Sequence, residues 1–204
     1  QMLLCIYIIL KSIIMPQPNS NPLIDLNESL QFKPKTEEYR GLIDLRHREN
    51  LDKLKPQIKT IKDALATKGL NNTAIAGVIG SLYQESKLNP ATHQLGGKGY
   101  GLPQYTKGSE RYKHLINSAK QNKSNINDLT FQANHLAEEM FSNDSSILSN
   151  AWLGEKNRQS FLKSDSPSQA TVTFTEKFLR PGKPDMQQRV YFANYINHIL
   201  KDMK

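Results

Sequence analysis

Apolar residues recur with helical spacing in the middle of the chain, and they predict a helix that begins near residue 72. Positions i, i+3, i+4 and i+7 of a helix face one way, and apolar side chains occupy them here: Ile75, Val78, Ile79 and Leu82. A side-chain oxygen of Asn72-Thr73 can bond the free N–H groups of the first turn, which predicts the start. Pro90 disfavours the helical conformation at Asn89, which predicts the end.

One carboxylate, Glu85, falls on the apolar face of this predicted helix. It lies seven residues after Val78 and three after Leu82, in the last turn or so. Partial burial disfavours the charged form of a carboxyl group, as a general acid that works near neutral pH requires. An ordinary surface glutamate at a frayed helix end is the alternative. The apolar position favours catalysis, so Glu85 is the candidate catalytic acid.

A glycine-rich segment follows, with the sequence GGKGYGLPQYT over residues 96–106. Glycines followed by alternating aromatic and polar residues predict a tight hairpin whose backbone a ligand can approach closely. Tyr100 and Tyr105 have two equal interpretations, because their rings can stack on sugar rings or pack in the core. Gln104 is the polar side chain of the hairpin.

The remaining periodicity predicts more helices and a mainly α fold with one small β hairpin. Helices are expected at 56–69, 109–122, 127–140, 166–180 and 184–201, and an irregular region is expected around Trp152 and Gly154. Three segments follow from this pattern. Residues 1–15 form an apolar N-terminal segment, 16–51 a linker and charged helix, and 52–204 the catalytic domain.

The N-terminal segment has three interpretations. Residues 2–15 are apolar except for Lys11, and this length is short for a membrane span. An export signal, a short membrane anchor, or upstream sequence translated ahead of a start at Met15 would each fit. Contact with a membrane is expected only through these residues.

Charge and composition restrict the partners. The 204 residues include 27 Lys and Arg against 19 Asp and Glu, a net charge of +8, which favours anionic partners. The lysines are spread along the chain and no nucleic-acid motif is present, so a cell wall with acidic polymers is favoured and nucleic acid is not expected. A single cysteine and five histidines without metal-ligand spacing predict no metal and no cofactor.

Two blocks of sequence carry a family resemblance. The stretch AIAGVIGSLYQESKLNP followed by GYGLPQYT resembles the phage tail lysozyme family, within the lysozyme and lytic transglycosylase superfamily. The pair Glu85-Ser86 followed by Gly-Leu-x-Gln at 101–104 also resembles the soluble lytic transglycosylase pattern. The closing segment ATVTFTEKFLRPGKPDMQQRVYFANYI is similar to the family's Arg-Pro turn and the Arg-bearing helix after it. The likeness covers roughly residues 52 to 200.

The resemblance implies a lysozyme-like domain that cleaves peptidoglycan. Glu85 would protonate the oxygen of the β-1,4 bond between N-acetylmuramic acid and N-acetylglucosamine. Ser86, Gln104 and the two hairpin tyrosines would contact substrate. The partners implied are peptidoglycan and proteins of a phage tail or another injection machine, with action outside the cytoplasm or on the virion. A non-catalytic wall-binding module of such a machine is the alternative from another class.

The second catalytic group is an open question. Glycosidases normally use two carboxylates, but no Asp or Glu lies between Ser86 and Ser109. Glu110 is the nearest candidate, although it can equally favour the dipole of the next helix. Water can therefore attack, as in a hydrolase, or the substrate's own 6-hydroxyl can attack, as in a lytic transglycosylase. The first outcome is narrowly favoured.

The chain also departs from the family pattern at three positions. Tyr105 stands where the family usually has Trp, Pro103 where it has Ala, and Leu179 where it tends to have an acid before Arg-Pro. Arg180 and Arg189 are expected to hold the structure together by pairing with carboxylates.

Overall fold

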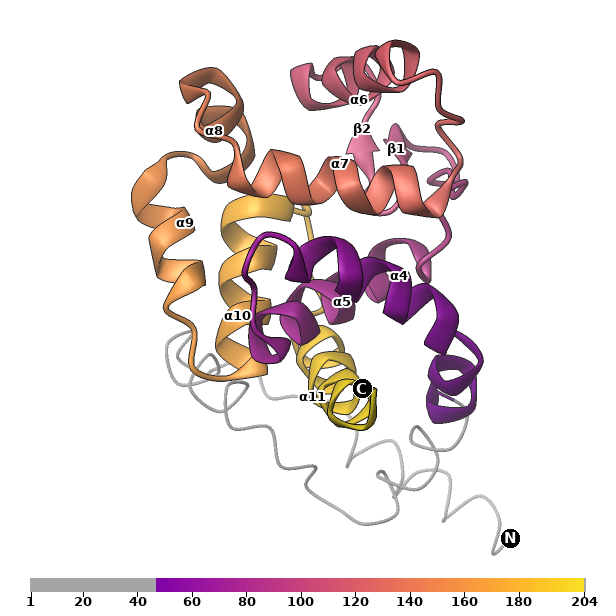
Figure 1. The fold of residues 1–204 in the computed structure, drawn as a ribbon, viewed down its shortest axis with the longest axis vertical. Coiled ribbons are helices and arrows are strands. Elements are labelled where there is room, and N and C mark those ends of the chain that lie inside the picture. Colours follow the sequence, from indigo (N-terminus) through magenta and orange to yellow (C-terminus); the bar gives the residue numbers. More distant parts are fainter. Residues whose placement is uncertain (1–46, 204) are drawn as a thin grey trace, which may run out of the picture. The chain divides into compact units, whose positions relative to one another are not determined.

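A computed structural model describes residues 47–203 of the chain (Figure 1). The expectations for residues 1–15 and for most of the 16–51 segment lie outside the described residues. The start of the catalytic domain at residue 52 stays a prediction. Residues 47–53 are helical.

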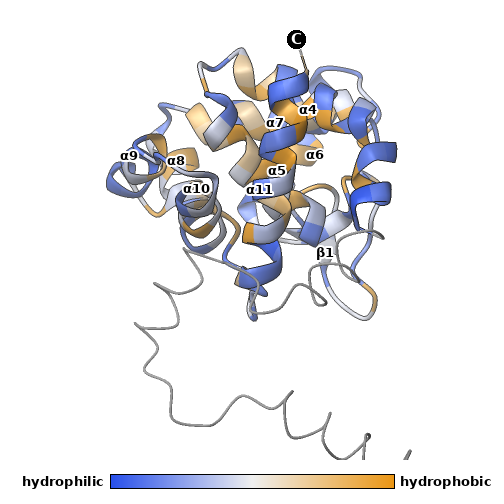
Figure 2. Ribbon diagram, turned by 90° about the horizontal axis from the view of Figure 1, so that it is seen from below, coloured by the Kyte–Doolittle hydropathy of each residue, from blue (hydrophilic) through white to orange (hydrophobic). Residues whose placement is uncertain are grey.

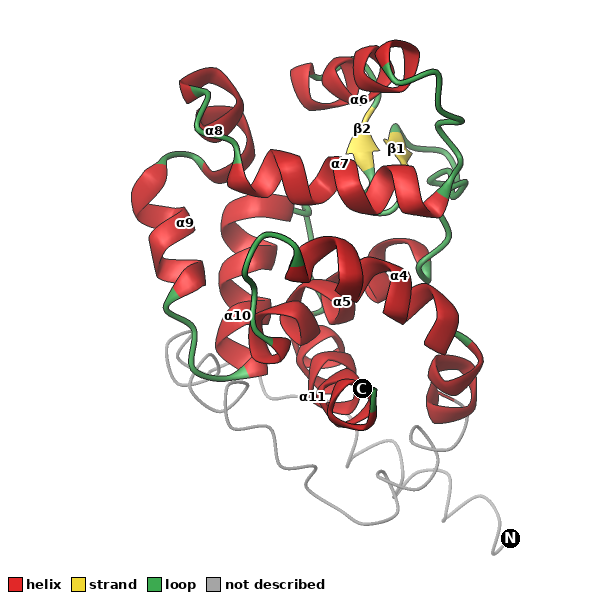
Figure 3. Ribbon diagram, in the orientation of Figure 1, coloured by secondary structure: helices red, strands yellow, loops and turns green. Residues whose placement is uncertain are grey.

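The described residues are mainly helical, as predicted (Figure 3). The helices are α4 (Lys55–Ala66), α5 (Asn72–Ser86), α6 (Glu110–Gln121), α7 (Leu129–Phe141), α8 (Ser145–Trp152), α9 (Glu155–Leu162), α10 (Pro167–Phe174), the π-helix η1 (Thr175–Leu179) and α11 (Met186–Asp202). Strands β1 (Gly99–Tyr100) and β2 (Tyr105–Thr106) form the predicted hairpin. They pair antiparallel, with Gly99 opposite Thr106 and Tyr100 opposite Tyr105.

Side-chain caps fix where most helices begin. A side-chain oxygen just before the helix accepts a hydrogen bond from a free N–H group of the first turn. The capping residues are Asn71, Ser109, Asp128, Asp144, Ser166 and Asp185. For α5 the cap is Asn71, whose side chain accepts from Ala74 N at 2.9 Å, one residue before the predicted pair.

Helix α5 lies at the centre of the packing, between α4 and α11 and beside α10 (Figure 1). Every residue from Ala74 to Tyr83 is buried, so the helix is enclosed on all sides and not on one face alone. Figure 2 shows the apolar residues gathered on α5 and on the helices around it.

Two glycines of α5 permit this close packing. A Cβ on Gly77 would lie 2.6 Å from Ala170 Cβ on α10, and one on Gly80 would lie 2.6 Å from Ala193 N on α11. Both distances are shorter than van der Waals contact allows, so a side chain at either position would push a neighbouring helix away. The glycines therefore hold α5 against two partners.

The expectation of an irregular region around Trp152 is wrong, because the chain forms the short helices α8 and α9 there. Asp144 caps α8, and the turn Leu153-Gly154 has φ angles of +58° and +110°. Such a left-handed turn joins two helices without breaking the fold. Trp152 is fully buried, packs against Phe161 and Phe178, and donates from Nε1 to Met140 O at 2.9 Å.

The helix expected over residues 166–180 changes its hydrogen-bond pattern after Phe174. Its last turn is the π-helix η1, in which Arg180 N donates to Thr175 O at 2.7 Å. Thr175 Oγ1 lies 3.1 Å from Ser81 Oγ, so η1 is hydrogen-bonded to the middle of α5. Single π turns occur frequently at functional sites.

Candidate active site

Helix α5 ends at Ser86, as predicted, through two consecutive left-handed residues. Lys87 has a φ of +53° and Leu88 a φ of +59°, and Lys87 N donates to Tyr83 O at 3.0 Å. Side chains disfavour this backbone region, so the turn stores strain that surrounding contacts must offset. Leu88 is buried, which anchors the turn. Strained turns concentrate at functional sites, and this one directly follows Glu85 and Ser86.

Glu85 is held by an arginine from the far end of the chain. Arg189 Nη2 donates to Glu85 Oε1 at 2.8 Å, and Arg189 Nη1 donates to Ser81 O at 3.1 Å. The Glu85 side chain is 14% exposed and that of Arg189 only 4%. Since Gly80 lies against Ala193 and Glu85 against Arg189, α5 and α11 run antiparallel. The expectation that Arg189 pairs with a carboxylate is confirmed, and its partner is the candidate acid.

Two features therefore meet at the Glu85 carboxyl group. The first is its partial burial, and the second is its ion pair with Arg189. The sequence predicts only the first of these. A second cation lies nearby, because Lys87 Nζ sits 4.5 Å from the centre of the Tyr83 ring. Apolar surroundings and the charge of Arg189 lower the pKa of Lys87.

Gln132 on α7 ties the hairpin to the chain that follows α5. Its Oε1 accepts from Leu102 N at 2.8 Å, and its Nε2 donates to Pro90 O at 2.8 Å. Gly101, with φ +74°, leaves room for this amide, because a Cβ there would lie 2.5 Å from Gln132 Oε1. The hairpin is thereby fixed to the segment that leaves the end of α5.

Ser86, the last residue of α5, lies where this segment begins. Its hydroxyl donates to Leu82 O at 3.2 Å, and its carbonyl accepts from Thr92 Oγ1 at 3.1 Å. The residue is buried. These contacts support the geometry of the turn, and a role for Ser86 in substrate binding stays a prediction.

Gln104 occupies the end of the hairpin turn with a φ of +53°. Its Nε2 donates to Gly101 O at 2.8 Å and to Thr92 O at 3.3 Å. The amide donor is therefore used inside the hairpin. Among residues 47–203 no hydrogen bond reaches Oε1, which leaves this oxygen as the group that can accept a bond from a ligand.

The two hairpin tyrosines are buried. Tyr100 and Tyr105 are 4% and 3% exposed and pack with Leu115 in a small second core. Tyr100 OH donates to Asn127, and Tyr105 OH donates to Glu139 Oε2 at 3.0 Å. Of the two interpretations of these rings, burial favours core packing over stacking on sugars.

Sequence reasoning does not identify Glu139, a buried carboxylate on α7. Arg111 donates two hydrogen bonds to this carboxylate, from Nε to Oε1 at 2.6 Å and from Nη2 to Oε2 at 3.0 Å. Burial and the Glu139 carboxylate raise the pKa of Tyr105 well above its ordinary value of 10. The available signal is the spacing of Gln132, His135 and Glu139, which puts three polar residues on one face of α7.

Two further predicted residues, Glu110 and Arg180, do not contact Glu85. Glu110 starts α6 with a side chain that is 68% exposed and 2.7 Å from Lys113 Nζ. The carboxylate pairing expected of Arg180 is wrong, because its guanidinium donates to the backbone oxygens of Asn150 and Ala151 at 2.7 and 3.1 Å. These carbonyls belong to the last turn of α8, where oxygens lack helical partners.

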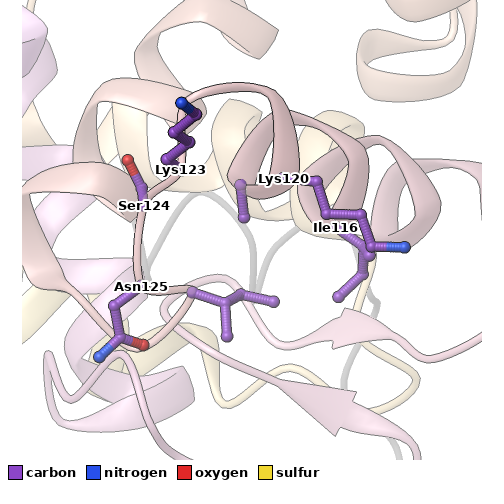
Figure 4. Close-up of a pocket in the computed structure, with 7 residues that line it drawn as sticks. Ile116, Lys120, Lys123, Ser124 and Asn125 are labelled. Carbon is purple, nitrogen blue, oxygen red and sulfur yellow. The ribbon is translucent and has the colours of Figure 1, made fainter.

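A shallow cavity of about 420 Å³ opens where α6 meets the following turn (Figure 4). It is lined by Ile116, Ala119, Lys120, Lys123, Ser124, Asn125 and Ile126. None of these residues belongs to α5 or to the hairpin, so the cavity is not part of the candidate site.

Among the described residues, no cluster of His, Cys, Asp or Glu is placed to hold a metal ion. Within the same residues, no helix is both long and apolar enough to cross a membrane.

A helical domain with a small hairpin beside the end of a glutamate-bearing helix is a lysozyme-like fold. The chain matches the phage tail lysozyme family over residues 56–200, more than half of its length, and belongs to that family. A comparison with curated proteins found no match. Membership confirms the resemblance and gives the chain a lysozyme-like, peptidoglycan-lytic function in a phage tail context, with action on the virion or outside the cell.

Proposed function

We propose that the chain is a peptidoglycan glycosidase that cleaves the β-1,4 bond between N-acetylmuramic acid and N-acetylglucosamine, with Glu85 as the general acid. One observation carries the proposal. Glu85 stands at a strained helix end with one carboxyl oxygen bonded to Arg189, and its side chain stays 14% exposed. A catalytic acid needs this combination of a fixed carboxyl group and access to substrate.

The role of Glu85 follows from the chemistry of glycosidic bonds. Its carboxyl proton passes to the bridging oxygen as the C–O bond breaks, and the sugar becomes oxocarbenium-like. The hairpin would border the bound glycan, with Gln104 Oε1 as an acceptor for a sugar hydroxyl or amide. The two buried tyrosines would hold the hairpin in place through their packing in the second core and would not contact the substrate.

Water as the nucleophile would give a lysozyme, and a base for it has to come from outside the hairpin. Glu110 is poorly suited, because its side chain is exposed and paired with Lys113. Asp185 is the candidate that we propose instead. It caps the start of α11, four residues before the arginine that binds Glu85, and its exposed side chain accepts from Gln188 N. Hydrolysis with Asp185 assisting is the form of the mechanism that we favour.

A lytic transglycosylase is the second candidate, and one feature favours it. Residues 87–109 contain no carboxylate, so the hairpin offers no base that could activate water. If the 6-hydroxyl of the substrate attacks instead, Glu85 alone can act first as acid and then as base. Products would then end in an anhydro sugar.

The test uses purified cell walls and the full chain. Glu85→Gln should abolish lysis, and Glu110→Gln, the same chemical change on an exposed helix, should not. Mass spectrometry of the fragments separates the outcomes, because reducing ends mean hydrolysis and anhydro-muramic ends mean transglycosylation. Asp185→Asn keeps a capping oxygen but removes the charge, so a loss of reducing ends in this variant identifies the base. Lysis by a folded Glu85→Gln variant at more than a few per cent of wild type would refute the proposal.

A further inference from the structure

Arg189 is buried more deeply than the carboxylate it binds. Its side chain is 4% exposed, and its Nε has no hydrogen-bond partner. A buried guanidinium is costly unless a carboxylate and further acceptors surround it. Glu85 is the only carboxylate within ion-pair distance of Arg189 among the described residues. Within residues 47–203, the candidate acid and Ser81 O are therefore the acceptors that compensate the burial of this cation.

No other described group competes with Arg189 for Glu85. Helix α10, which packs on α5, has no titratable side chain. In η1, Glu176 and Lys177 pair with each other at 3.6 Å. On α4, Lys59 pairs with Asp63, and Lys62 donates to Met203 O. Lys87 lies over the rings of Tyr83 and Phe192, and Asp185 caps the start of α11. In the described part of the chain, Arg189 is the one charged group in direct contact with the Glu85 carboxylate.

We propose that Arg189 is a positioning residue that fixes Oε1 of Glu85 and stabilises the carboxylate that is left once the proton has been transferred. The inference rests on the proposed catalytic role of Glu85. With Oε1 held by the guanidinium, Oε2 is the atom that carries the proton toward the glycosidic oxygen. When the proton leaves, the O–H bond of Glu85 breaks, an O–H bond forms on the departing sugar, and Arg189 stabilises the carboxylate that remains.

The pH dependence of kcat/KM tests this role. The acid form of Glu85 is the active one, so the rate falls on the alkaline side as the proton is lost. Removing the positive charge with Arg189→Gln favours the acid form, so the alkaline limb should move to higher pH. Arg189→Lys keeps the charge and should keep the limb near its wild-type position.

A purely structural arginine would give a different result. Activity would fall by the same factor at every pH, the alkaline limb would not move in Arg189→Gln, and the proposal would be overturned.

The wild-type protein supplies a measurement that does not depend on a folded variant or on activity. In the full chain with ¹³C-labelled glutamate and ¹⁵N-labelled arginine, the Glu85 carboxyl carbon and the Arg189 side-chain nitrogens should titrate with one midpoint. The Glu85→Gln variant assigns both signals. Independent midpoints would refute the inference. Lysis by Glu85→Gln would instead refute the proposed function, and the shared midpoint would still be observed, so the two failures can be told apart.

Discussion

Two carboxylate–arginine pairs of the same chemistry lie in this molecule with opposite burial. In the Glu139–Arg111 pair the carboxylate is 2% exposed and the guanidinium 14%. In the Glu85–Arg189 pair the guanidinium is 4% exposed and the carboxylate 14%. In the first pair the anion is enclosed and the cation reaches the surface. In the second pair these positions are reversed.

The acceptor sites differ in the same sense. Both oxygens of Glu139 are bonded, by Arg111 and by Tyr105 OH. Only Oε1 of Glu85 has a described partner. A carboxylate whose lone pairs are taken holds elements together, and one with a free oxygen can exchange a proton with a ligand. The comparison shows that occupancy of the oxygens, more than burial, separates a structural acid from a candidate catalytic one.

The largest effect expected is on activity, from Glu85→Gln. General acid catalysis typically contributes roughly 10²–10⁴-fold, so wall lysis should fall by that factor. The amide still accepts a bond from Arg189, but it leaves this buried guanidinium without a counter-charge. The fold should therefore persist with stability lower by up to about 3–5 kcal/mol. Turbidity assays with denaturant unfolding measure both. An unfolded Glu85→Gln variant would contradict the expectation that the fold persists without the charge of Glu85.

Glu139→Gln should lose a similar amount of stability but keep most of its activity. Breaking a buried pair costs about 3–5 kcal/mol, because it leaves an uncompensated charge. Glu138→Gln is the matched control, since Glu138 lies next to Glu139 in the sequence, is 68% exposed and forms an exposed ion pair with Lys68. The molecules that stay folded should lyse walls at a rate far closer to wild type than those of Glu85→Gln. A stable Glu139→Gln variant without activity would reverse the two assignments.

A smaller effect concerns His135, which packs beside the enclosed pair. Burial lowers the pKa of His135 from 6.5 to about 4, so the folded state binds fewer protons than the unfolded chain between these values. The contribution of neutral His135 to the free energy of unfolding should therefore be fully present above pH 6.5. It should be lost as the pH falls toward 4, by on the order of 2–3 kcal/mol. His135→Gln should flatten this slope in denaturant titrations, while the exposed His198→Gln should leave it unchanged.

The smallest effect is expected from Glu110→Gln. An exposed ion pair one turn apart contributes roughly 0.3–0.5 kcal/mol, so neither the melting temperature nor lysis should change appreciably. A loss of reducing ends in this variant would bring Glu110 back as the second catalytic group and would make hydrolysis independent of Asp185.

The sequence predicts the elements around the site well and their partnerships poorly. Local signals suffice for α5, which runs from its asparagine cap to its end at Ser86, and for the glycine-rich hairpin. The pair of Glu85 with Arg189 joins residues 104 positions apart, and no local pattern encodes such a contact. The same applies to Arg111 and Glu139, which are 28 positions apart.

Two local features were also beyond pattern reading. The helices α8 and α9 have 8 residues each, too few for a clear helical periodicity, and the cap Asp144 is the main local signal. The π turn after Phe174 depends on its bond to α5 through Thr175 and Ser81, so it is set by tertiary contact. The tyrosines of the hairpin show the same limit, because their burial depends on where α6 and α7 pack.

The close approach at Gly80 limits how this chain can change over generations. Alanine is the smallest replacement, yet its Cβ would lie 2.6 Å from Ala193 N, and α11 would have to give way. Because α11 also carries Arg189, that displacement would part the arginine from Glu85. A position with no chemistry of its own is therefore linked to the Glu85–Arg189 contact, and substitution in α5 is restricted by a backbone contact as well as by the carboxylate.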